Sequence, residues 1–435
     1  MRVLVLDGNE NQAVACVRSL ARAGHEVSVG AETSWSKAGW SRFARAKFRY
    51  APPQRDAEAF VETVAAETAR TRDTQGASRV RGTPEVSSAS GTLVLPLTER
   101  TTLPLSAARE KIFAAGGRLV LPPHETVLRA FDKRQTTRLA ASLGVAVPRT
   151  ESISDRERAR DFAARALYPV VLKPRSSEEL TAAGAVRATG APAYARDARE
   201  FVSAFDALRR RCAEVLAQEF VEGAGAGYFA LMREGEPRAE FAHRRLRDVR
   251  PTGSGSALRE SVAVGARLRE AGLAVLRELR WHGVAMVEFR VRADGTPVFL
   301  EVNGRFWNSL ALAVHAGADF PAMLARMAET GDVEPSFDYR AGVRCRWLLG
   351  DFRHLLEVMR GAPAGFPGAF PARGRTLLNF LKPVAGTFHD NFSADDPAPE
   401  LGDWLDFIFR RLPARARARG GEPKDLHAQS GFSLP

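Results

Sequence analysis

Lysine is scarce in this sequence, because only seven of its 63 basic residues are lysines and the rest are arginines. The arginines are spread along the chain, so the net charge of +12 reflects a general bias in composition rather than one basic patch. Such a charge permits attraction to phosphates, anionic lipids or nucleic acids without requiring any of them. An ammonium and a guanidinium are not interchangeable at a phosphate, so a lysine within an apolar strand calls for a specific reason here.

Cysteines and long apolar runs are also lacking. The three cysteines, Cys16, Cys212 and Cys345, are odd in number and far apart, which suggests neither a disulfide framework nor a zinc site. No run of 18 apolar residues is present, which argues against a transmembrane helix, and the first apolar run is too short for a signal peptide. With 45% hydrophobic and 26% charged residues, the composition predicts a cytoplasmic globular protein of two or three domains.

Residues 1–120 alternate apolar strands with segments of helical spacing. This pattern predicts βαβ units and therefore a parallel sheet with right-handed crossovers. The first strand is followed by DGNENQ instead of GxGxxG, so a dinucleotide site is poorly supported. The segment 71–91 is rich in Arg, Thr, Ser and Gly and is expected to be a mobile surface insertion.

The pattern changes after about residue 125. A helix over 133–142, with Asp132 as its N-cap, precedes the apolar strand YPVVLKP, which contains Lys173. The strands VLAQEF and GYFALM follow, with the glycine-rich loop VEGAGAG between them. A long polar segment, 243–261, leads to an expected helix over 262–280. The signals in the last hundred residues are weaker, and the arginine cluster at 410–419 is interpreted as a solvated tail or an anion-binding patch.

The stretch VEFRVRADGTPVFLEVNGR, residues 287–305, places two carboxylates opposite each other. Asp294-Gly295 predicts a two-residue β-turn, which pairs Glu288 with Glu301. The predicted apolar core face pairs Val287, Phe289 and Val291 with Val302, Leu300 and Val298. Like charges directly opposite destabilise a sheet, and a divalent cation held by these carboxylates and Asn303 would remove the repulsion. The alternative is an incidental glutamate pair on a solvated strand face.

These pieces, in this order, resemble the ATP-grasp superfamily, and their pattern is similar to that of its carboxylate–amine ligases and carbamoyl-phosphate synthase-like members. The resemblance covers roughly residues 125–330 and is carried by FDK at Lys133, YPVVLKP at Lys173, QEF-V-EG at 218–223, VEF at Glu288 and FLEVNGRFW at 299–307. It implies an α/β chain with a Rossmann-like parallel-sheet domain over 1–122. An ATP-grasp fold of α+β type would follow over 123–332, with a lid at roughly 145–230. A smaller C-terminal extension with a basic tail would occupy 333–435.

The resemblance also implies a chemistry. Mg-ATP, or Mn-ATP, would bind between two α+β subdomains, and a carboxylate activated as an acyl phosphate would be attacked by an amine to form a carbon–nitrogen bond. The implied phosphate ligands are Lys133 and Lys173. The implied nucleotide contacts at the hinge are Gln218, Glu219, Val221 and Glu222. The implied metal ligands are Glu288, Glu301 and Asn303, and Arg305 is implied to stabilise charge on the transferring phosphoryl group. For the lysines the alternative is a surface position, and for Gln218 an ordinary strand end.

The polar segment 243–261 is the candidate site for the acceptor substrate. Its cationic side chains match carboxylates, and PTGSGS offers backbone N–H groups to an anion; the candidates are His243, Arg244, Arg245 and Arg259. The alternative is a flexible polar loop. Two departures from the family pattern concern ATP: the loop after Lys173 has few glycines, and Ala224 stands where many members carry a ribose-binding acidic residue.

Three classes of function remain in competition. The first is the ligase, acting on small-molecule carboxylate and amine substrates. The second is a non-catalytic ATP-binding regulatory or assembly protein on the same fold, which the departure at Ala224 favours slightly. The third is a nucleic-acid-binding protein, but the arginine clusters lack interleaved aromatic residues, so no specific nucleic-acid partner is expected. Relatives often form dimers, so a homodimer is also an expectation.

Overall fold

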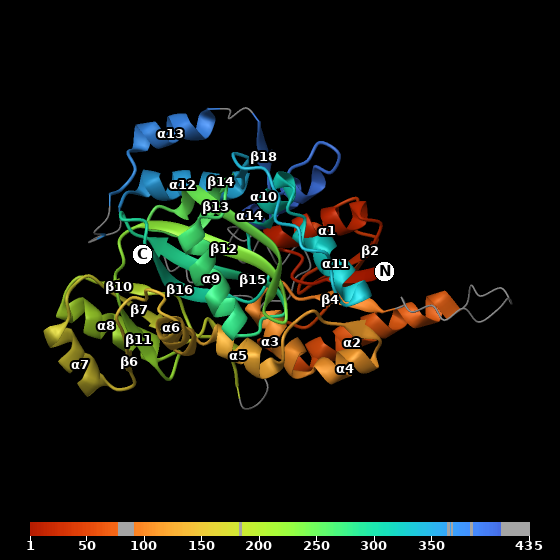
Figure 1. Ribbon diagram of the computed structural model, residues 1–435. Helices are drawn as coiled ribbons and strands as arrows, with labels where there is room; N and C mark the ends of the chain where they lie inside the picture. The colour runs from red at the N-terminus through yellow and green to blue at the C-terminus, as the bar shows by residue number, and fades with distance from the viewer. Residues whose placement is uncertain (77–90, 182–184, 363–365, 367–368, 383–385, 410–435) are drawn as a thin grey trace.

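The computed structural model describes residues 1–76, 91–181, 185–362, 366, 369–382 and 386–409. Its main sheets have five, four and seven strands. In Figure 1 the five-stranded sheet, in red and orange, and the four-stranded sheet, in yellow and green, lie at opposite sides of the molecule. The seven-stranded sheet lies between them, so it is the centre around which the other parts are arranged.

The N-terminal sheet is parallel throughout, as the βαβ pattern predicts. Its order is β3-β2-β1-β4-β5, with β1 (Arg2–Val5), β2 (Glu26–Ala31), β3 (Ala46–Arg49), β4 (Thr92–Leu95) and β5 (Gly117–Arg118). Both faces of a parallel sheet are covered by crossover helices, so its strands are apolar on both sides. The accompanying helices are α1 (Asn11–Arg22), η1 (Ala38–Trp40), α2 (Ala57–Gly76), α3 (Glu99–Ala107), α4 (Arg109–Ala114) and α5 (His124–Phe131).

The four-stranded sheet is antiparallel and lies within the range predicted for the lid. Its order is β10-β7-β11-β6, with β6 (Thr150–Ile153), β7 (Val170–Pro174), β10 (Ala193–Ala195) and β11 (Val215–Glu219). Helices α7 (Arg156–Arg165) and α8 (Ala198–Arg209) pack against it through a core that includes Phe201 and Phe205. The short hairpin of β8 (Glu178–Leu180) and β9 (Val186–Ala188) follows β7.

The seven-stranded sheet has the order β16-β15-β12-β13-β14-β17-β18. Its strands are β12 (Ala224–Arg233), β13 (Glu236–Arg250), β14 (Ser254–Val262), β15 (Gly283–Val291), β16 (Pro297–Asn303), β17 (Arg344–Arg346) and β18 (Thr387–His389). Along β12, Tyr228 and Ala230 pack on one face and Phe229 and Leu231 on the other, as expected from the two-residue period of a strand. The first face meets α6 (Lys133–Ser142) and α9 (Ala266–Glu278), and the second meets α10 (Leu310–Ala316), α11 (Phe320–Thr330) and α1.

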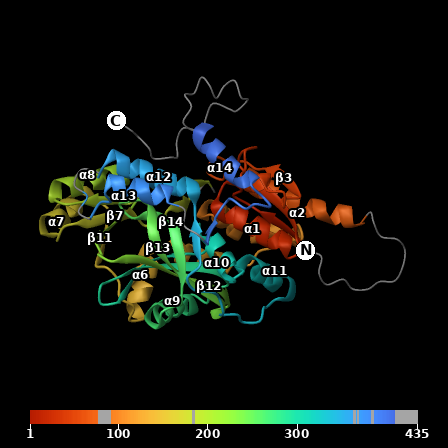
Figure 2. The same cartoon turned by 90° about the horizontal axis from the view of Figure 1, so that it is seen from above.

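The last part of the described chain joins this large sheet instead of forming a sheet of its own. Strand β17 pairs with β14, and β18 pairs with β17. The remaining helices are α12 (Leu348–Arg360), α13 (Arg373–Leu381) and α14 (Ala398–Phe409). Figures 1 and 2 both place α14 beside the N-terminal sheet, where Asp403 pairs with Lys37. The predicted boundary at residue 332 stays a prediction, but the residues after it are integrated with both earlier parts.

The β15–β16 hairpin pairs Glu288 with Glu301, although the predicted two-residue turn is wrong. The N–H of Arg292 donates to the carbonyl of Thr296, and Gly295 has a φ of 80°, so the loop has three residues. A β-bulge between Glu288 and Phe289 compensates for the extra residue. Because of the bulge, Phe289 pairs with Phe299 in the core, and Leu300 lines the cavity rather than the predicted core face.

The polar segment 243–261 is two long paired strands rather than a loop. It covers the end of β13 and most of β14, which pair in antiparallel fashion with two register shifts. Its side chains therefore alternate between faces, which decides which arginines can reach the cavity.

Two predictions fall largely on residues that are not described. The expected mobile insertion spans 71–91; its first residues, 71–76, instead form the end of α2, and 77–90 lie outside the described residues. The arginine cluster at 410–419 also lies outside them. Among the helices of the described ranges, none combines the length and the apolar composition that a membrane crossing requires.

Candidate functional site

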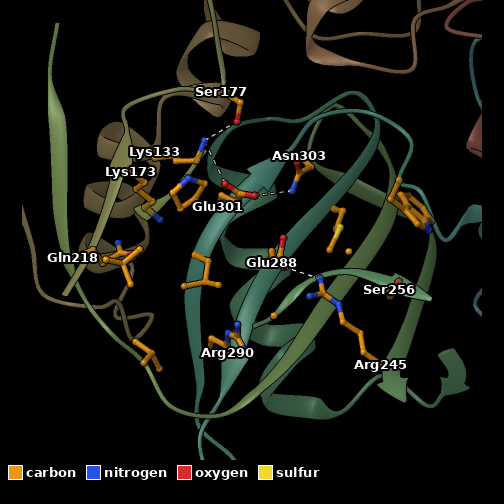
Figure 3. Close-up of a pocket in the computed structure, with 18 of the residues that line it drawn as sticks. Lys133, Lys173, Ser177, Gln218, Arg245, Ser256, Glu288, Arg290, Glu301 and Asn303 are labelled. Atoms are coloured by element: carbon orange, nitrogen blue, oxygen red, sulfur yellow. Dashed lines mark hydrogen bonds and ion pairs between the residues drawn. The ribbon is translucent and has the colours of Figure 1, made fainter. Parts of the chain in front are cut away.

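A cavity of about 440 Å³ opens between the four-stranded and the seven-stranded sheets. Figure 3 shows Lys133, Lys173 and Gln218 on one side of it and Glu288, Glu301 and Arg245 on the other. Eleven predicted site residues line this cavity: Lys133, Lys173, Gln218, Glu219, Val221, His243, Arg245, Glu288, Glu301, Asn303 and Arg305. Glu222, Arg244 and Arg259 are not among its lining residues.

Lys133 is fixed at the first turn of α6. The predicted N-cap is present, because the Asp132 carboxylate accepts hydrogen bonds from the backbone N–H groups of Arg134 and Gln135, both at 3.0 Å. Asp132 also pairs with Arg175 at the end of β7, which ties the helix to the four-stranded sheet. Burial raises the pKa of Asp132, but hydrogen bonds from Arg175 and Gln135 outweigh burial and lower it overall. The Lys133 ammonium then lies 3.0 Å from Ser177 Oγ and 3.4 Å from Glu301 Oε2.

Lys173 reaches the cavity from β7. It is only 6% exposed and has no hydrogen-bond or ion-pair partner among the described residues. Burial lowers its pKa to about 8, because desolvation disfavours the ammonium, with a smaller raising effect from Glu301. A buried cation without a partner is costly, so this position is suited to an anion that enters the cavity.

The two facing carboxylates are each held by a cation. Glu301 is close to Lys133, and Glu288 accepts a hydrogen bond of 2.7 Å from Arg245. Burial raises the pKa of Glu301, but Lys133 and Lys173 outweigh burial and lower it overall. The lowered pKa keeps Glu301 in its carboxylate form.

These donors suit a magnesium ion. Two carboxylates face each other across one hairpin, and Asn303 lies beside them, with its Nδ2 at 3.5 Å from Glu301 Oε1. Oxygen donors of this kind are what Mg²⁺ prefers, and it usually completes its shell with water and substrate phosphates. The described ranges, this cavity included, contain no group of three or more His, Cys, Asp or Glu side chains that could hold a metal ion, so the candidate site has two carboxylates and one amide. Arg305, two residues after Asn303, donates 3.0 Å hydrogen bonds to Asn303 Oδ1 and to the carbonyl of Phe306.

The predicted hinge forms the opposite wall. Gln218 is 4% exposed and donates from Nε2 to Thr150 Oγ1 at 2.9 Å. The backbone N–H of Glu219 is already used by the carbonyl of Arg149, so fewer backbone donors face the cavity than the sequence suggested. Glu222 is exposed and lies outside the lining.

The acceptor candidates separate by strand alternation. His243 and Arg245 on β13 line the cavity, whereas Arg244 between them is exposed and pairs with Glu260. Arg259 is fully buried, and its guanidinium donates to both carboxylate oxygens of Asp390 at 2.8 and 2.7 Å. It therefore joins β14 to the chain after β18 instead of lining the cavity.

The sequence suggested that His243 is a cationic donor, but in the structure it is not. Burial, followed by the nearby Arg245 and Arg259, lowers its pKa well below the usual value, so the imidazole is neutral. Its Nε2 lies 2.8 Å from Ser309 Oγ, and its ring stacks on Phe229 with centroids 4.8 Å apart.

Sequence reasoning missed several lining residues. Ser177, Tyr194, Ser256, Met286, Arg290, Leu300, Trp307, Asn308 and Ser309 also face the cavity. Trp307 carries the clearest signal, because the aromatic pair after NGR extends the FLEVNGRFW motif itself. Leu300 could not be found without knowledge of the bulge, and Ser256 not without the strand register of β14.

Comparisons with known proteins agree on the fold. No protein-family model matches the chain. The sequence is 25% identical over 305 residues to the N-terminal section of the carbamoyl phosphate synthase large chain of Methanopyrus kandleri. That alignment covers 63% of this chain and 52% of the relative, so the chain spans about half the length of this curated relative.

Solved structures of three enzymes superimpose on most of the chain. Biotin carboxylase from Campylobacter jejuni, in its β-γ-ATP complex, has a TM-score of 0.58 at 15% identity and covers 77% of this chain and 72% of that one. N5-carboxyaminoimidazole synthetase from Staphylococcus aureus has a TM-score of 0.58 at 14% identity, covering 82% and 85%. L-amino acid ligase from Bacillus licheniformis has a TM-score of 0.51 at 16% identity, covering 77% and 74%. The chain has the ATP-grasp fold.

The predicted resemblance to ATP-grasp proteins is therefore confirmed at the level of the fold. In the ATP-grasp fold of this chain, the cavity is the space between the four-stranded sheet and the seven-stranded sheet. The N-terminal parallel sheet precedes it, as the sequence indicates. The residue roles stay predictions.

Proposed function

We propose that the protein is an ATP- and Mg²⁺-dependent ligase that activates a carboxylate as an acyl phosphate for attack by an amine. The observation that carries this proposal is the pairing of Glu288 with Glu301 in a cavity that also contains Arg305 and the buried Lys173, which has no partner among the described residues. A protein that only holds a nucleotide has no need for this combination of opposed carboxylates and converging cations. The folds of biotin carboxylase and L-amino acid ligase support the same class of reaction.

The proposed reaction has two transfers. A carboxylate oxygen attacks the γ-phosphorus of ATP, the bond from that phosphorus to the β–γ bridging oxygen breaks, and ADP leaves. The amine nitrogen then attacks the acyl carbon, the carbon–oxygen bond to phosphate breaks, inorganic phosphate leaves, and the nitrogen loses a proton. Such phosphoryl transfers depend mainly on positioning and on charge stabilisation.

The residues of this chain divide these tasks. Lys173 and Lys133 would neutralise phosphate oxygens, and Arg305 would stabilise the charge that develops on the transferring group. Gln218 and Val221 would contact the adenine end, and Leu300 also lines the cavity. Glu288, Glu301 and Asn303 would hold Mg²⁺, which supplies charge neutralisation at the phosphates when bound.

One observation favours the alternative of an ATP-binding protein without turnover. Ala224 at the start of β12 offers no carboxylate for the ribose, and Glu222 is exposed outside the cavity. This departure bears on ATP affinity and leaves the carboxylate–cation arrangement intact.

The test is release of ADP from Mg-ATP by the purified chain, with hydroxylamine as a general amine and a panel of free carboxylic acids. We expect ADP release that requires both Mg²⁺ and an acid. Arg305→Ala should lower the turnover about 100-fold or more while an ATP analogue still binds. The matched control is Arg267→Ala, an exposed arginine beside the β15–β16 turn. Absence of acid-dependent turnover in a chain that binds Mg-ATP would favour the non-catalytic alternative.

A further inference from the structure

Two residues that line the cavity carry buried ring nitrogens without partners. Trp307 is 2% exposed and His243 is 4% exposed, and both line the cavity. Neither Trp307 Nε1 nor His243 Nδ1 has a hydrogen-bond partner within the described part of the chain. A buried polar atom without a partner is destabilising, so such groups at a cavity are suited to a ligand that supplies the missing partner.

The two rings are held rigidly. Phe229 packs against both, with ring centroids 4.5 Å from Trp307 and 4.8 Å from His243. Phe320 packs edge-on to Trp307 at 5.0 Å, and Ser309 bonds His243 at its other nitrogen. The indole N–H therefore cannot turn to another protein acceptor without disturbing this core.

The part of the cavity lined by Trp307, His243 and Arg305, here called the corner, is suited to an anionic ligand with oxygen acceptors. An indole N–H is a donor only, so its partner must be an acceptor. Arg305 lies two residues before Trp307 and lines the same cavity, so the ligand's charge would meet a guanidinium. An ammonium group would be repelled by the Arg305 guanidinium and could not accept a hydrogen bond from the indole. This part of the cavity therefore suits the carboxylate substrate rather than the amine substrate.

The corner also has an apolar side. Met286 and the His243 ring line the cavity, and so do the small residues Gly255 and Ser256 on β14. A bicarbonate ion has no group that could contact these surfaces, whereas an organic acid with an apolar or aromatic substituent does.

We propose that Trp307 and His243 form the subsite for the carboxylate substrate, and that this substrate is an organic acid with an apolar or aromatic group. The carboxylate accepts a hydrogen bond from Trp307 Nε1–H beside Arg305, and the apolar group packs on Met286 and the His243 ring. This inference rests on the proposed ligase function, because it assigns one of that reaction's two substrates.

The experiment measures ADP release with Mg-ATP, hydroxylamine and one acid at a time, from bicarbonate, formate and acetate to benzoate, L-alanine and L-phenylalanine. We expect benzoate or L-phenylalanine to stimulate release more than formate and bicarbonate. Trp307→Phe keeps an aromatic ring but removes the donor, so KM for the best acid should rise about tenfold, equivalent to one hydrogen bond. The dissociation constant of a non-hydrolysable ATP analogue should not change.

Trp404→Phe is the matched control, because it removes an indole donor that bonds Glu400 outside the cavity. A second readout is the ¹H–¹⁵N spectrum of the tryptophan indoles. The Trp307 signal is identified as the one that is absent from the spectrum of Trp307→Phe. In the wild type this signal should shift when the best acid is added together with Mg²⁺ and the ATP analogue. An unchanged KM in Trp307→Phe, or stimulation by bicarbonate alone, would overturn this inference. Failure of the wild type to bind the analogue, or no response to any acid while it binds, would instead remove the proposed function on which the inference rests.

Discussion

At the scale of the residue, charge pairing organises the cavity. Glu301 faces Lys133, and Glu288 is bonded to Arg245, so each predicted metal ligand already has a cation beside it. Lys173 differs, because no ion-pair partner is found for it in the described ranges and burial lowers its pKa to about 8. The ammonium of Lys173 is therefore the cation whose charge state changes most easily when a phosphate enters.

Nucleotide affinity should consequently depend on pH above about 8. In the free protein Lys173 loses its proton near this pH, and a bound phosphate favours the ammonium and raises its pKa, so binding takes up a proton. Affinity for a non-hydrolysable ATP analogue should be constant below pH 7 and fall by up to about tenfold per unit above pH 8. Calorimetry in buffers of different ionisation enthalpy measures both the affinity and the proton uptake.

Lys173→Arg is the matching variant. A guanidinium stays charged but does not fit the position of a compact ammonium, so binding should be weaker at pH 7 and largely independent of pH. Lys111→Arg, which changes a surface lysine paired with Glu62, serves as the control. Equal affinity of the wild type at pH 7 and pH 9 would contradict this role of Lys173.

The sequence predicts well which residues line the cavity. It predicts less well which side chains form ion pairs and hydrogen bonds with each other. Glu288, Glu301, Asn303 and Arg305 follow from a strand period of two within one motif, which is a local property. The separation of Arg245 from Arg244 and Arg259 depends on strand register and on Asp390, which lies more than a hundred residues away in the chain. Such long-range partners leave no periodic signal.

At the scale of the element, caps and bulges place these residues. Asp132 caps α6 and also pairs with Arg175 of the adjoining chain after β7, so one carboxylate positions the elements that carry Lys133 and Lys173. The hairpin illustrates the limits of local signals, because Asp294-Gly295 correctly marks a turn, but the bulge that restores the pairing of Glu288 with Glu301 depends on packing of Phe299 in the core.

Asp132→Ala should therefore affect both stability and binding. Loss of the cap should cost about 1 kcal/mol of unfolding free energy, and loss of the Arg175 pair should add to it. Affinity for the ATP analogue should fall because Lys133 and Lys173 are less well positioned. Asp155→Ala is the control, since Asp155 caps α7 in the same way, with a 2.9 Å bond from Arg158 N, away from the cavity. Equal effects of the two variants on binding would show that the cap at α6 has no special role.

At the scale of the whole molecule, a buried polar network joins the first, central and last parts of the chain. Asp390, after β18, accepts two hydrogen bonds from Arg259 on β14, and Arg18 of α1 pairs with Asp396 at 2.9 Å. Asn11 of α1 donates to Asn308 at the cavity at 2.9 Å. The parallel sheet and the ATP-grasp fold could be predicted from local patterns, whereas this network could not, because its members are scattered along the sequence.

Asp390→Ala should destabilise the whole molecule. It leaves the fully buried Arg259 without its carboxylate, which typically costs about 3–5 kcal/mol. Asp332→Ala is the control, because Asp332 is 41% exposed where it pairs with Arg233 and Arg238, and such exposed pairs contribute about 1 kcal/mol or less each. Urea unfolding followed by tryptophan fluorescence compares the two variants. A loss for Asp390→Ala no larger than that for Asp332→Ala would mean that the network does not hold the parts together.

The most direct test of the central claim is calorimetric titration of a non-hydrolysable ATP analogue into wild type and Glu301→Gln, with and without Mg²⁺. The amide keeps the size of the side chain but removes one of the two charges that would hold the ion. We expect micromolar binding to wild type that strengthens with Mg²⁺, and binding to Glu301→Gln that no longer responds to Mg²⁺. Absence of binding to a well-folded wild type, or an equal response to Mg²⁺ in both proteins, would contradict the account.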